Sequence, residues 1–231
     1  MKLLARKFKI RDKKIVDLIA FNKPNSPITE QYRLIRNNLN FASVDKEIKT
    51  ITVTSPEPSD GKTTTSANLA IVLAQQGKTV VLVDADLRKP SVHYAFNVSN
   101  IDGLTSVLTK DISLVEAIFK TNIPNLDILT SGRIPPNPSE LLDSKTMENI
   151  MEELKELYDF IIFDTPPILL VTDSQIMANK CDGVVLVVAS GKTKKDQGMK
   201  AKELLQKANS QVLGVVVNGV RAKGEYYGYY G

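Results

Sequence analysis

The chain has 231 residues, of which 42% are hydrophobic and 24% charged, as expected for one ordinary soluble domain or one large α/β unit. Its single cysteine excludes an intramolecular disulfide and fits a reducing compartment. No apolar run approaches the roughly 18 to 20 residues that span a bilayer, so we expect no membrane crossing. No basic patch is interleaved with base-stacking aromatics, so nucleic-acid binding is not expected either.

The positive net charge of +4 is concentrated at the N-terminus, where seven of the first 14 residues are Lys or Arg. Residues 1–27 are therefore predicted to form a basic N-terminal arm. The segment lacks the apolar region and the cleavage site of a signal peptide. Two interpretations stay open: a solvated arm, or an arm attracted to an anionic membrane surface or an acidic partner.

Further along the chain, short β-branched apolar runs alternate with helical patterns. The predicted strands are 48–55, 79–86, 125–132, 159–166, 183–190 and 212–219. The predicted helices are 28–43, 63–77, 113–120, 139–158 and 194–209. Strands rich in valine and isoleucine are typical of a parallel sheet covered by helices on both faces. The predicted fold is α/β, with a doubly wound, mostly parallel sheet like that of P-loop NTPases, in a single domain at 28–219. Such a sheet binds its ligand beyond the carboxyl ends of the strands. Cys181, beside one of these strands, is predicted to be a buried core residue rather than a nucleophile.

The first predicted strand leads into the segment TSPEPSDGKTTTSANLA, in which Gly61, Lys62 and Thr63 open a helix. Backbone N–H groups and the positive end of the helix dipole at such a junction bind phosphate oxygens. Lys62 would reach the β- and γ-phosphates, and the Thr63 hydroxyl would ligate Mg²⁺. The full pattern has another glycine where this chain has Pro56, but the strand-to-helix junction still predicts a site for ATP and Mg²⁺. The predicted cofactor-binding residues are Ser59, Asp60, Gly61, Lys62, Thr63 and Thr64.

Carboxylates close two more of the predicted strands, with Asp84 and Asp86 in LVDAD and Asp164 in IIFD. Burying a carboxylate without a partner is costly, and near a nucleotide the natural partner is Mg²⁺. The alternative is that these aspartates cap the helices that follow. Because Asp84 and Asp86 are two residues apart on one strand, both are expected to point to the same side. One would serve the metal and the other would accept a proton from an incoming hydroxyl. Arg88 and Lys89 would stabilise the transferring phosphate or a partner's carboxylate, or be solvated.

These motifs together resemble the bacterial tyrosine kinases (BY-kinases) of capsule and exopolysaccharide operons, in the Gram-positive form whose cytoplasmic kinase is a separate polypeptide. The resemblance runs from about residue 24 to 231 and rests on SPEPSDGKT, LVDADLRKP, IIFDTPP, SGRIPPNPSELL and the terminal tyrosines. It implies an ATP-dependent protein-tyrosine kinase that regulates capsular or exopolysaccharide synthesis and export. The catalytic residues would be Lys62, Asp84, Asp86 and Asp164, with Asp84 as the base and with Thr63, Asp86 and Asp164 holding Mg²⁺.

The resemblance also implies partners and a location. The family motif Glu-x-x-Arg-x-x-Arg is present as Glu30, Arg33 and Arg36. In the family this helical stripe joins neighbouring subunits into a ring, expected here to be an octamer; pairing within one helix is the alternative. A separate transmembrane activator and a cognate tyrosine phosphatase are expected. The kinase would be cytoplasmic and held at the inner face of the membrane through its activator.

One residue of the phosphate loop departs from the family, which usually has glycine where this chain has Ser59. A positive φ at Ser59 would be strained by ~1 kcal/mol. The rival interpretation is a partner-switching ATPase of the cell-division and partition type, which shares this architecture. Those ATPases have a signature lysine where this chain has Glu57. A non-catalytic adaptor that binds nucleotide as a switch is a third possibility.

Four of the seven tyrosines lie in the last six residues, as Tyr226, Tyr227, Tyr229 and Tyr230. Aromatic residues set among glycines cannot build a packed core, so residues 220–231 are predicted to be a flexible tail. The resemblance implies that its tyrosines are autophosphorylation sites. An extended tail would span roughly 40 Å, enough to reach a neighbouring subunit, so we expect phosphorylation in trans. Each phosphate adds about −1.5 to −2 charge, so full modification should dissociate the ring.

Overall fold

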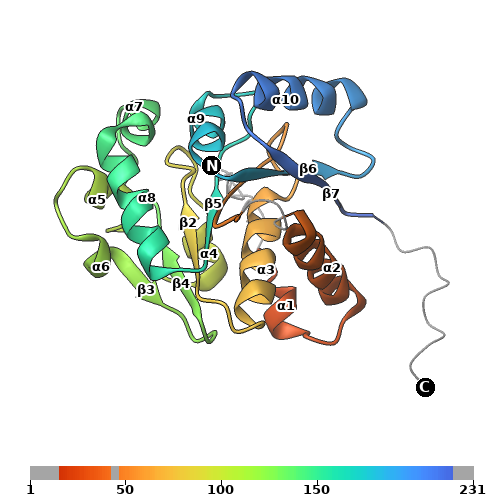
Figure 1. Ribbon diagram of the computed structural model, residues 1–231, viewed down its shortest axis with the longest axis horizontal. Helices are drawn as coiled ribbons and strands as arrows, with labels where there is room; N and C mark the ends of the chain where they lie inside the picture. The colour runs from red at the N-terminus through yellow and green to blue at the C-terminus, as the bar shows by residue number, and fades with distance from the viewer. Residues whose placement is uncertain (1–15, 43–46, 221–231) are drawn as a thin grey trace, which may run out of the picture.

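The computed structural model describes residues 16–42 and 47–220. In this part of the chain, a seven-stranded sheet lies between two layers of helices (Figure 1). The strand order is β3-β4-β2-β5-β1-β6-β7, and all neighbouring strands are parallel except β3 and β4. The predicted α/β fold with a mostly parallel sheet is confirmed. The tail tyrosines and residues 1–15 of the predicted arm lie outside the described residues.

All six predicted strands are present, each somewhat shorter than its predicted segment. They are β1 (Thr50–Thr54), β2 (Val80–Asp84), β4 (Leu126–Leu129), β5 (Phe160–Asp164), β6 (Gly183–Ala189) and β7 (Val212–Asn218). The predicted helix over 113–120 is partly wrong, because only α6 (Leu114–Ala117) is helical and the chain continues as β3 (Ile118–Lys120). Ile118 and Phe119 pair antiparallel with β4, so tertiary pairing of these β-formers outweighs the helical pattern before them.

The long helices also agree with the sequence pattern, as α2 (Pro27–Ala42), α3 (Lys62–Ala74) and α10 (Lys195–Lys207). The single helix predicted over 139–158 is instead two helices, α7 (Pro138–Asp143) and α8 (Lys145–Leu157). Ser144 separates them, because its Oγ accepts a hydrogen bond from the Met147 N–H and so caps α8. Four further short helices were not predicted: α1 (Ile19–Asn22), α4 (Val92–Phe96), α5 (Leu104–Leu108) and α9 (Asp173–Lys180).

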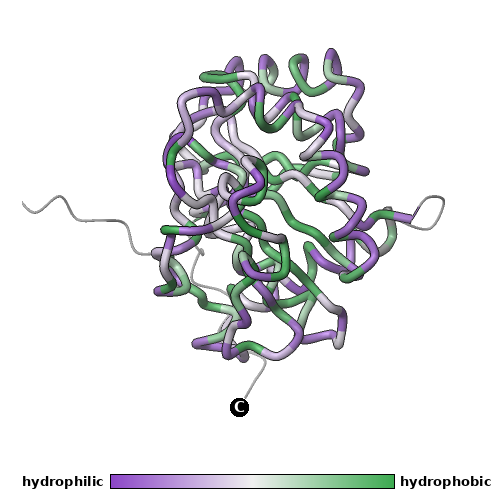
Figure 2. The backbone as a smooth tube through the Cα atoms, turned by 90° about the vertical axis from the view of Figure 1, so that its left-hand side faces the viewer, coloured by the Kyte–Doolittle hydropathy of each residue, from purple (hydrophilic) through white to green (hydrophobic). Residues whose placement is uncertain are grey.

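The sheet is covered on both faces. One core contains α1, α2 and α3 over strand residues such as Ile51 and Leu82, and the other contains α5, α8 and α9 over residues such as Val83 and Phe163. In Figure 2 the hydrophobic colour follows the strands through the interior, whereas α10 at the top alternates between hydrophobic and hydrophilic residues. Among the described helices, none combines the length and the apolar character needed to cross a membrane.

Residues 16–27 form part of the packed domain, although the sequence predicts them to be in the basic arm. Ala20 of α1 is fully buried, and its N–H donates to Asn68 Oδ1 of α3 at 2.9 Å. The side chain of Gln75 donates back to the Ala20 carbonyl. The predicted boundary at residue 27 is therefore wrong, because the packed domain begins before it.

Candidate active site

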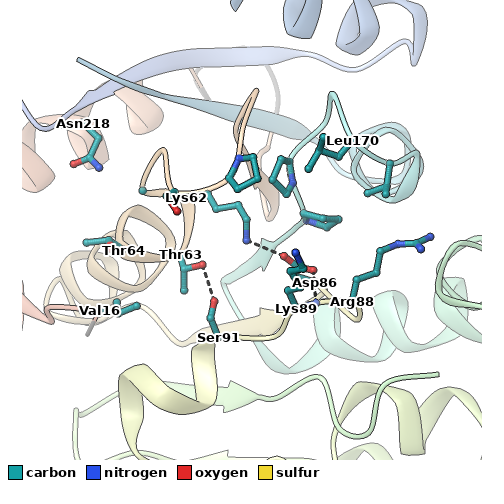
Figure 3. Close-up of a pocket in the computed structure, with 16 residues that line it drawn as sticks. Val16, Lys62, Thr63, Thr64, Asp86, Arg88, Lys89, Ser91, Leu170 and Asn218 are labelled. Atoms are coloured by element: carbon teal, nitrogen blue, oxygen red, sulfur yellow. Dashed lines mark hydrogen bonds and ion pairs between the residues drawn. The ribbon is translucent and has the colours of Figure 1, made fainter. Parts of the chain in front are cut away.

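A pocket of about 610 Å³ lies beyond the carboxyl ends of the strands (Figure 3). Its walls come from the phosphate loop after β1, the segment after β2 and the segment after β5, and Val16 and Asn218 also line it. Because parallel strands bring their carboxyl ends to one edge of the sheet, motifs far apart in the sequence meet there. The structure thus brings the three predicted motifs together at one site.

The phosphate loop contains two residues in the left-handed backbone conformation. Ser59 has φ 62°, and Gly61, which precedes α3, has φ 101°. The φ of Gly61 is one that residues with a Cβ rarely adopt, and a Cβ there would also lie 1.9 Å from Asn218 Nδ2 and displace that side chain. A loop with such left-handed residues before a helix presents successive N–H groups to an anion. The cradle therefore fits the phosphates of a nucleotide.

Most of the predicted loop residues line the pocket, namely Ser59, Gly61, Lys62, Thr63 and Thr64. Asp60 is not among the residues that line the pocket, and its role in cofactor binding stays a prediction. Its side chain is fully buried, and its Oδ2 accepts a hydrogen bond from the Glu57 N–H at 3.0 Å. Its Oδ1 lies 2.8 Å from the Lys192 ammonium. The Asp60 side chain therefore stabilises the loop through contacts made outside the pocket.

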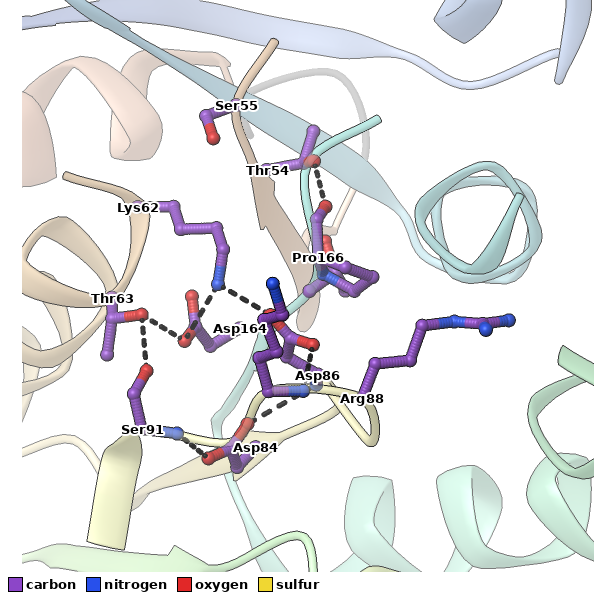
Figure 4. A network of polar contacts seen from close by, with 12 residues as sticks. Thr54, Ser55, Lys62, Thr63, Asp84, Asp86, Arg88, Ser91, Asp164 and Pro166 are labelled. Carbon is purple, nitrogen blue, oxygen red and sulfur yellow. Dashed lines mark hydrogen bonds and ion pairs between the residues drawn. The ribbon is translucent and has the colours of Figure 1, made fainter. Parts of the chain in front are cut away.

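Lys62 lies between two carboxylates (Figure 4). Its Nζ is 3.0 Å from Asp86 Oδ2 and 3.7 Å from Asp164 Oδ2, and the side chain is almost completely buried. Burial alone would lower the pKa of the Lys62 ammonium, but the charges of Asp164 and Asp86 outweigh it and raise this pKa. Lys62 is therefore a permanent cation next to the phosphate cradle.

Asp164 is held by hydroxyl groups at the end of β5. Thr63 Oγ1 donates to its Oδ2 at 2.6 Å, and Ser66 Oγ donates to its Oδ1 at 3.1 Å. Burial raises the pKa of Asp164, and the Lys62 charge opposes this effect. No three acidic, histidine or cysteine side chains among the described residues form a ready-made metal cage. A hydroxyl, two carboxylates and the phosphates of the nucleotide are instead the oxygen ligands that Mg²⁺ prefers.

Strand alternation does not set the relative directions of Asp84 and Asp86, because β2 ends at Asp84 and Asp86 lies in the loop that follows. Asp84 is fully buried, and its Oδ2 accepts hydrogen bonds from the N–H groups of Ser91 and Val92, both at 2.9 Å. Asp84 thus bonds N–H groups at the start of α4 from the end of β2, whereas the N-cap residue of that helix is Ser91. Burial, with the nearby charge of Asp164, raises the pKa of Asp84 to about 7. Asp86 lines the pocket and faces Lys62.

Arg88 has its carboxylate partner within the chain. Its guanidinium binds both oxygens of the buried Asp173 side chain, at 2.8 and 3.0 Å, and also donates to Ser139 Oγ. These contacts tie the segment after β2 to α7 and α9. Lys89 lines the pocket, and its backbone N–H donates to Asp86 Oδ1.

Several residues at the pocket were not predicted from the sequence. Ser91 lies 3.0 Å from Thr63 Oγ1, Asn218 donates to the Asp60 carbonyl, and an apolar wall follows β5. That wall consists of Pro166, Pro167, Leu170 and Val171. The prolines belong to the quoted IIFDTPP motif, but nothing local in the sequence connects Asn218 to a loop so far away along the chain.

A family model described as an AAA domain matches residues 48–211. Tyrosine-protein kinase YwqD of Bacillus subtilis (strain 168) is 55% identical over 216 residues, which cover 93% of this chain and 91% of that protein. The chain belongs to the bacterial tyrosine-protein kinases. The kinase domain of the Escherichia coli tyrosine kinase ETK matches this kinase with a TM-score of 0.86 and 33% identity, covering 96% of this chain and 89% of that one. The predicted family resemblance and the predicted protein-tyrosine kinase activity are confirmed.

The rival class shares the architecture of this kinase at a lower level of similarity. The septum site-determining protein MinD of Pyrococcus horikoshii OT3, solved with Mg-ADP, has a TM-score of 0.63 and 28% identity. The match covers 73% of this kinase and 69% of MinD. The common fold supports nucleotide binding, whereas the higher identity over nearly the whole chain distinguishes the kinases from the partner-switching ATPases.

Proposed function

We propose that this kinase transfers the γ-phosphoryl group of ATP to the tyrosines of its own C-terminal tail, in trans, between the subunits of a ring. The observation that carries the proposal is the buried Lys62 cation, placed between Asp86 and Asp164 at the end of the phosphate cradle. In the ATP complex, Lys62 would contact the β- and γ-phosphates, and Thr63, Asp86 and Asp164 would hold Mg²⁺. The metal ion would neutralise charge on the transferring group.

The base in this proposal is Asp84. Its raised pKa of about 7 lies near the working pH, as general-base catalysis requires. Because Oδ2 is occupied by the N–H groups of Ser91 and Val92, the atom left to accept the tyrosyl proton is Oδ1. Among the described residues, that atom accepts one long hydrogen bond, from the Asp86 N–H at 3.3 Å. Asp86 is the second candidate, since it lines the pocket directly.

The tail starts close to the active site. β7 ends at Asn218, whose side chain lines the pocket, and the tyrosines follow within residues 226–230. A tail in this place could enter its own pocket or, at an extended length of roughly 40 Å, the pocket of a neighbour. We propose the second route, because the extended tail is long enough for it and because accumulated phosphate charge could then separate the subunits.

The remaining parts of the proposal concern partners and location. The ring, an octamer by family resemblance, would be joined through the outer face of α2, where Glu30 pairs with Arg33 and where Leu34 and Phe41 are exposed. A separate transmembrane activator would hold the kinase at the inner face of the membrane, and a tyrosine phosphatase would reverse the modification. The pathway regulated would be capsular or exopolysaccharide synthesis and export.

The test is a mixture of two subunits that differ in mass. A Lys62→Met subunit should fold and have no activity of its own, since it lacks the cation that neutralises the phosphates. Mixed with active wild type and ATP, it should become phosphorylated on its tail. An unlabelled Lys62→Met tail beside a labelled wild-type tail would show transfer in cis and would refute the trans mechanism.

A matched control replaces Tyr226, Tyr227, Tyr229 and Tyr230 by phenylalanine in the active subunit. This variant should lose most of its own labelling, still label a Lys62→Met partner, and keep its oligomeric size in the presence of ATP. Dissociation of the phenylalanine variant by ATP would show that tail phosphate is not what separates the subunits.

A further inference from the structure

The phosphate loop is held from outside by side chains of the C-terminal part of the domain. Asn218, at the end of β7, donates to the Asp60 carbonyl at 3.0 Å. Gln197 of α10 donates to Glu57 Oε1 at 3.1 Å. Lys192, in the turn between β6 and α10, forms an ion pair with Asp60. Figure 3 shows Asn218 beside the loop that leads to Lys62. None of these residues belongs to the phosphate-loop motif.

The Lys192 ammonium contacts the residues on both sides of Ser59. It donates to the Pro58 carbonyl at 2.5 Å and to Asp60 Oδ1 at 2.8 Å. Ser59 has φ 62°, a left-handed conformation that a residue with a Cβ adopts reluctantly. One cation therefore bridges the ends of the strained turn. Opening the turn would break both contacts.

Asp60 makes this bridge difficult to replace. Its side chain is fully buried, and a buried carboxylate needs a charged or hydrogen-bonding partner. Among the described residues, its ion pair is with Lys192 alone, because Lys62 is engaged by Asp86 and Asp164. Its other oxygen accepts the Glu57 N–H. Loss of Lys192 would leave Asp60 with a backbone hydrogen bond and no counter-charge.

The backbone around Lys192 is itself fixed. The Lys192 N–H and the Thr193 N–H both donate to the Ala189 carbonyl, and Thr193 Oγ1 accepts the Ala189 N–H at 2.8 Å. Gly191 has φ 69°, which permits the tight turn after β6. The Lys192 ammonium thus reaches the phosphate loop from a hydrogen-bonded turn that follows β6.

We propose that Lys192 is a positioning residue for ATP binding, which holds the phosphate loop in its phosphate-binding conformation by bridging Pro58 and Asp60 across the left-handed Ser59. The proposal rests on the nucleotide site of the proposed function and is independent of which tyrosine accepts the phosphate. It also gives a reason why Ser59, a residue with a Cβ, can hold a left-handed conformation here.

The main experiment measures the binding of ATP with Mg²⁺ to the full chain by calorimetry. Lys192→Met should raise the Kd about fivefold or more, because the loop must be reordered on binding. Lys192→Arg, which retains a cation with several donors, should bind within about twofold of wild type. Lys195→Met removes a neighbouring exposed lysine and serves as the matched control, with an unchanged Kd.

A second readout needs no nucleotide. Hydrogen exchange of residues 56–61 in ATP-free protein should be faster in Lys192→Met than in wild type, and unchanged in Lys195→Met. Adding Ser59→Gly to Lys192→Met should recover part of the lost affinity, because glycine adopts the left-handed conformation without a bridge. A lysine that merely stabilised the fold would not be rescued at Ser59.

The results distinguish a failure of the nucleotide site from a failure of the Lys192 bridge. Failure of the wild type to bind ATP would remove the nucleotide site itself. Binding by Lys192→Met within twofold of wild type, with unchanged exchange of the loop, would remove the bridge and leave the kinase assignment intact. If Lys192→Met does not fold, Asp60→Asn/Lys192→Met removes both charges together. That double variant should still bind ATP about fivefold more weakly, and wild-type affinity in it would overturn the proposal.

Discussion

Asp84 accepts hydrogen bonds from two backbone N–H groups at the start of α4, whereas Asp86 faces the Lys62 ammonium. The two side chains are only two positions apart in the sequence. Their chemistry nevertheless differs, because Asp84 ends a buried strand and Asp86 lies in the following loop. Replacing either aspartate by asparagine keeps the shape of the side chain and removes its charge. Such substitutions should therefore separate the roles of Asp84 and Asp86 in ATP binding and in phosphoryl transfer.

Asp84→Asn keeps an oxygen that can accept the N–H groups of Ser91 and Val92 but cannot accept a proton. We expect ATP affinity within about twofold of wild type and a loss of at least about 100-fold in autophosphorylation rate. Asp86→Asn should weaken Mg²⁺-dependent ATP binding as well. Calorimetry measures the affinity for ATP, and phosphotyrosine formation measures the rate of autophosphorylation. An Asp84→Asn variant that keeps the wild-type rate would assign the role of base to Asp86.

Cys181 is a core residue, as its sequence neighbourhood predicts, and burial raises the pKa of its thiol from 9.0 to about 12. The folded thiol keeps its proton where the unfolded thiol loses it, so this contribution to stability is present below pH 9.0 and is lost as the pH rises toward about 12. At pH 8.5 or so, iodoacetamide should modify native protein at least ~100-fold more slowly than denatured protein. Because the chain has one cysteine, total label reports this site, and rapid native labelling would contradict its burial.

At the scale of the elements, α2 has a structural role that its charge pattern does not reveal. Arg36 Nη1 donates to the Val72 carbonyl in the last turn of α3 at 3.0 Å. The neighbouring carbonyls of Ile71, Leu73 and Ala74 are bonded by the N–H groups that follow them. Arg36 thus completes the C-terminal capping of α3, the helix that begins at the phosphate loop.

Arg36→Ala should lower the free energy of unfolding by about 1 to 2 kcal/mol, because it leaves a helix-terminal carbonyl without its charged donor. Arg33→Ala is the control. Its ion pair with Glu30 lies on the surface of α2 and should contribute less than about 0.5 kcal/mol. Urea denaturation measures the free energy of unfolding of both variants. If Arg36→Ala were as stable as Arg33→Ala, water would replace the Arg36 hydrogen bond without loss of stability.

The elements that the sequence predicts are those with a local cause. β-branched runs predict the six core strands, and 3.6-residue periodicity predicts α2, α3 and α10. β3 could not be predicted, since Ile118 and Phe119 become a strand only by pairing with β4. The break at Ser144 has a local signal, a serine able to cap α8, but the apolar periodicity continues across it. Short helices such as α1 depend on tertiary packing.

At the scale of the whole molecule, the site residues also divide into those that sequence motifs predict and those that only the fold brings together. Lys62, Thr63 and the three aspartates were found from motifs at strand ends, because the polarity of a parallel sheet brings such ends together. Lys192 follows β6 and Asn218 ends β7, both far along the sequence from the phosphate loop, and only the complete sheet places them beside it. The partner of Arg88 is equally non-local, since Asp173 belongs to α9.

The outer face of α2 decides whether subunits assemble as proposed. Arg36, the third residue of the predicted stripe, donates one hydrogen bond from Nη1 to its own α3. The involvement of all three charges in a subunit contact stays a prediction. Glu30 and Arg33 remain on the surface of α2, beside Leu34 and Phe41, whose side chains are 53% and 75% exposed. Exposed apolar groups next to a charge pair are typical of an interface. In a closed ring the same weak contact is repeated at every subunit.

Glu30→Ala/Arg33→Ala, with Arg36 retained, should therefore convert unphosphorylated ring to a monomer that stays folded and still binds ATP. Leu34→Ser/Phe41→Ser should do the same through the apolar part of the face. Sedimentation velocity measures the size, and the rate of tail phosphorylation should fall with the fraction of ring if transfer occurs between subunits. Variants that keep the wild-type size at all concentrations would place the subunit contact on another surface. Monomers that retain the full rate would instead separate assembly from phosphorylation, and the tail would then be modified within its own subunit.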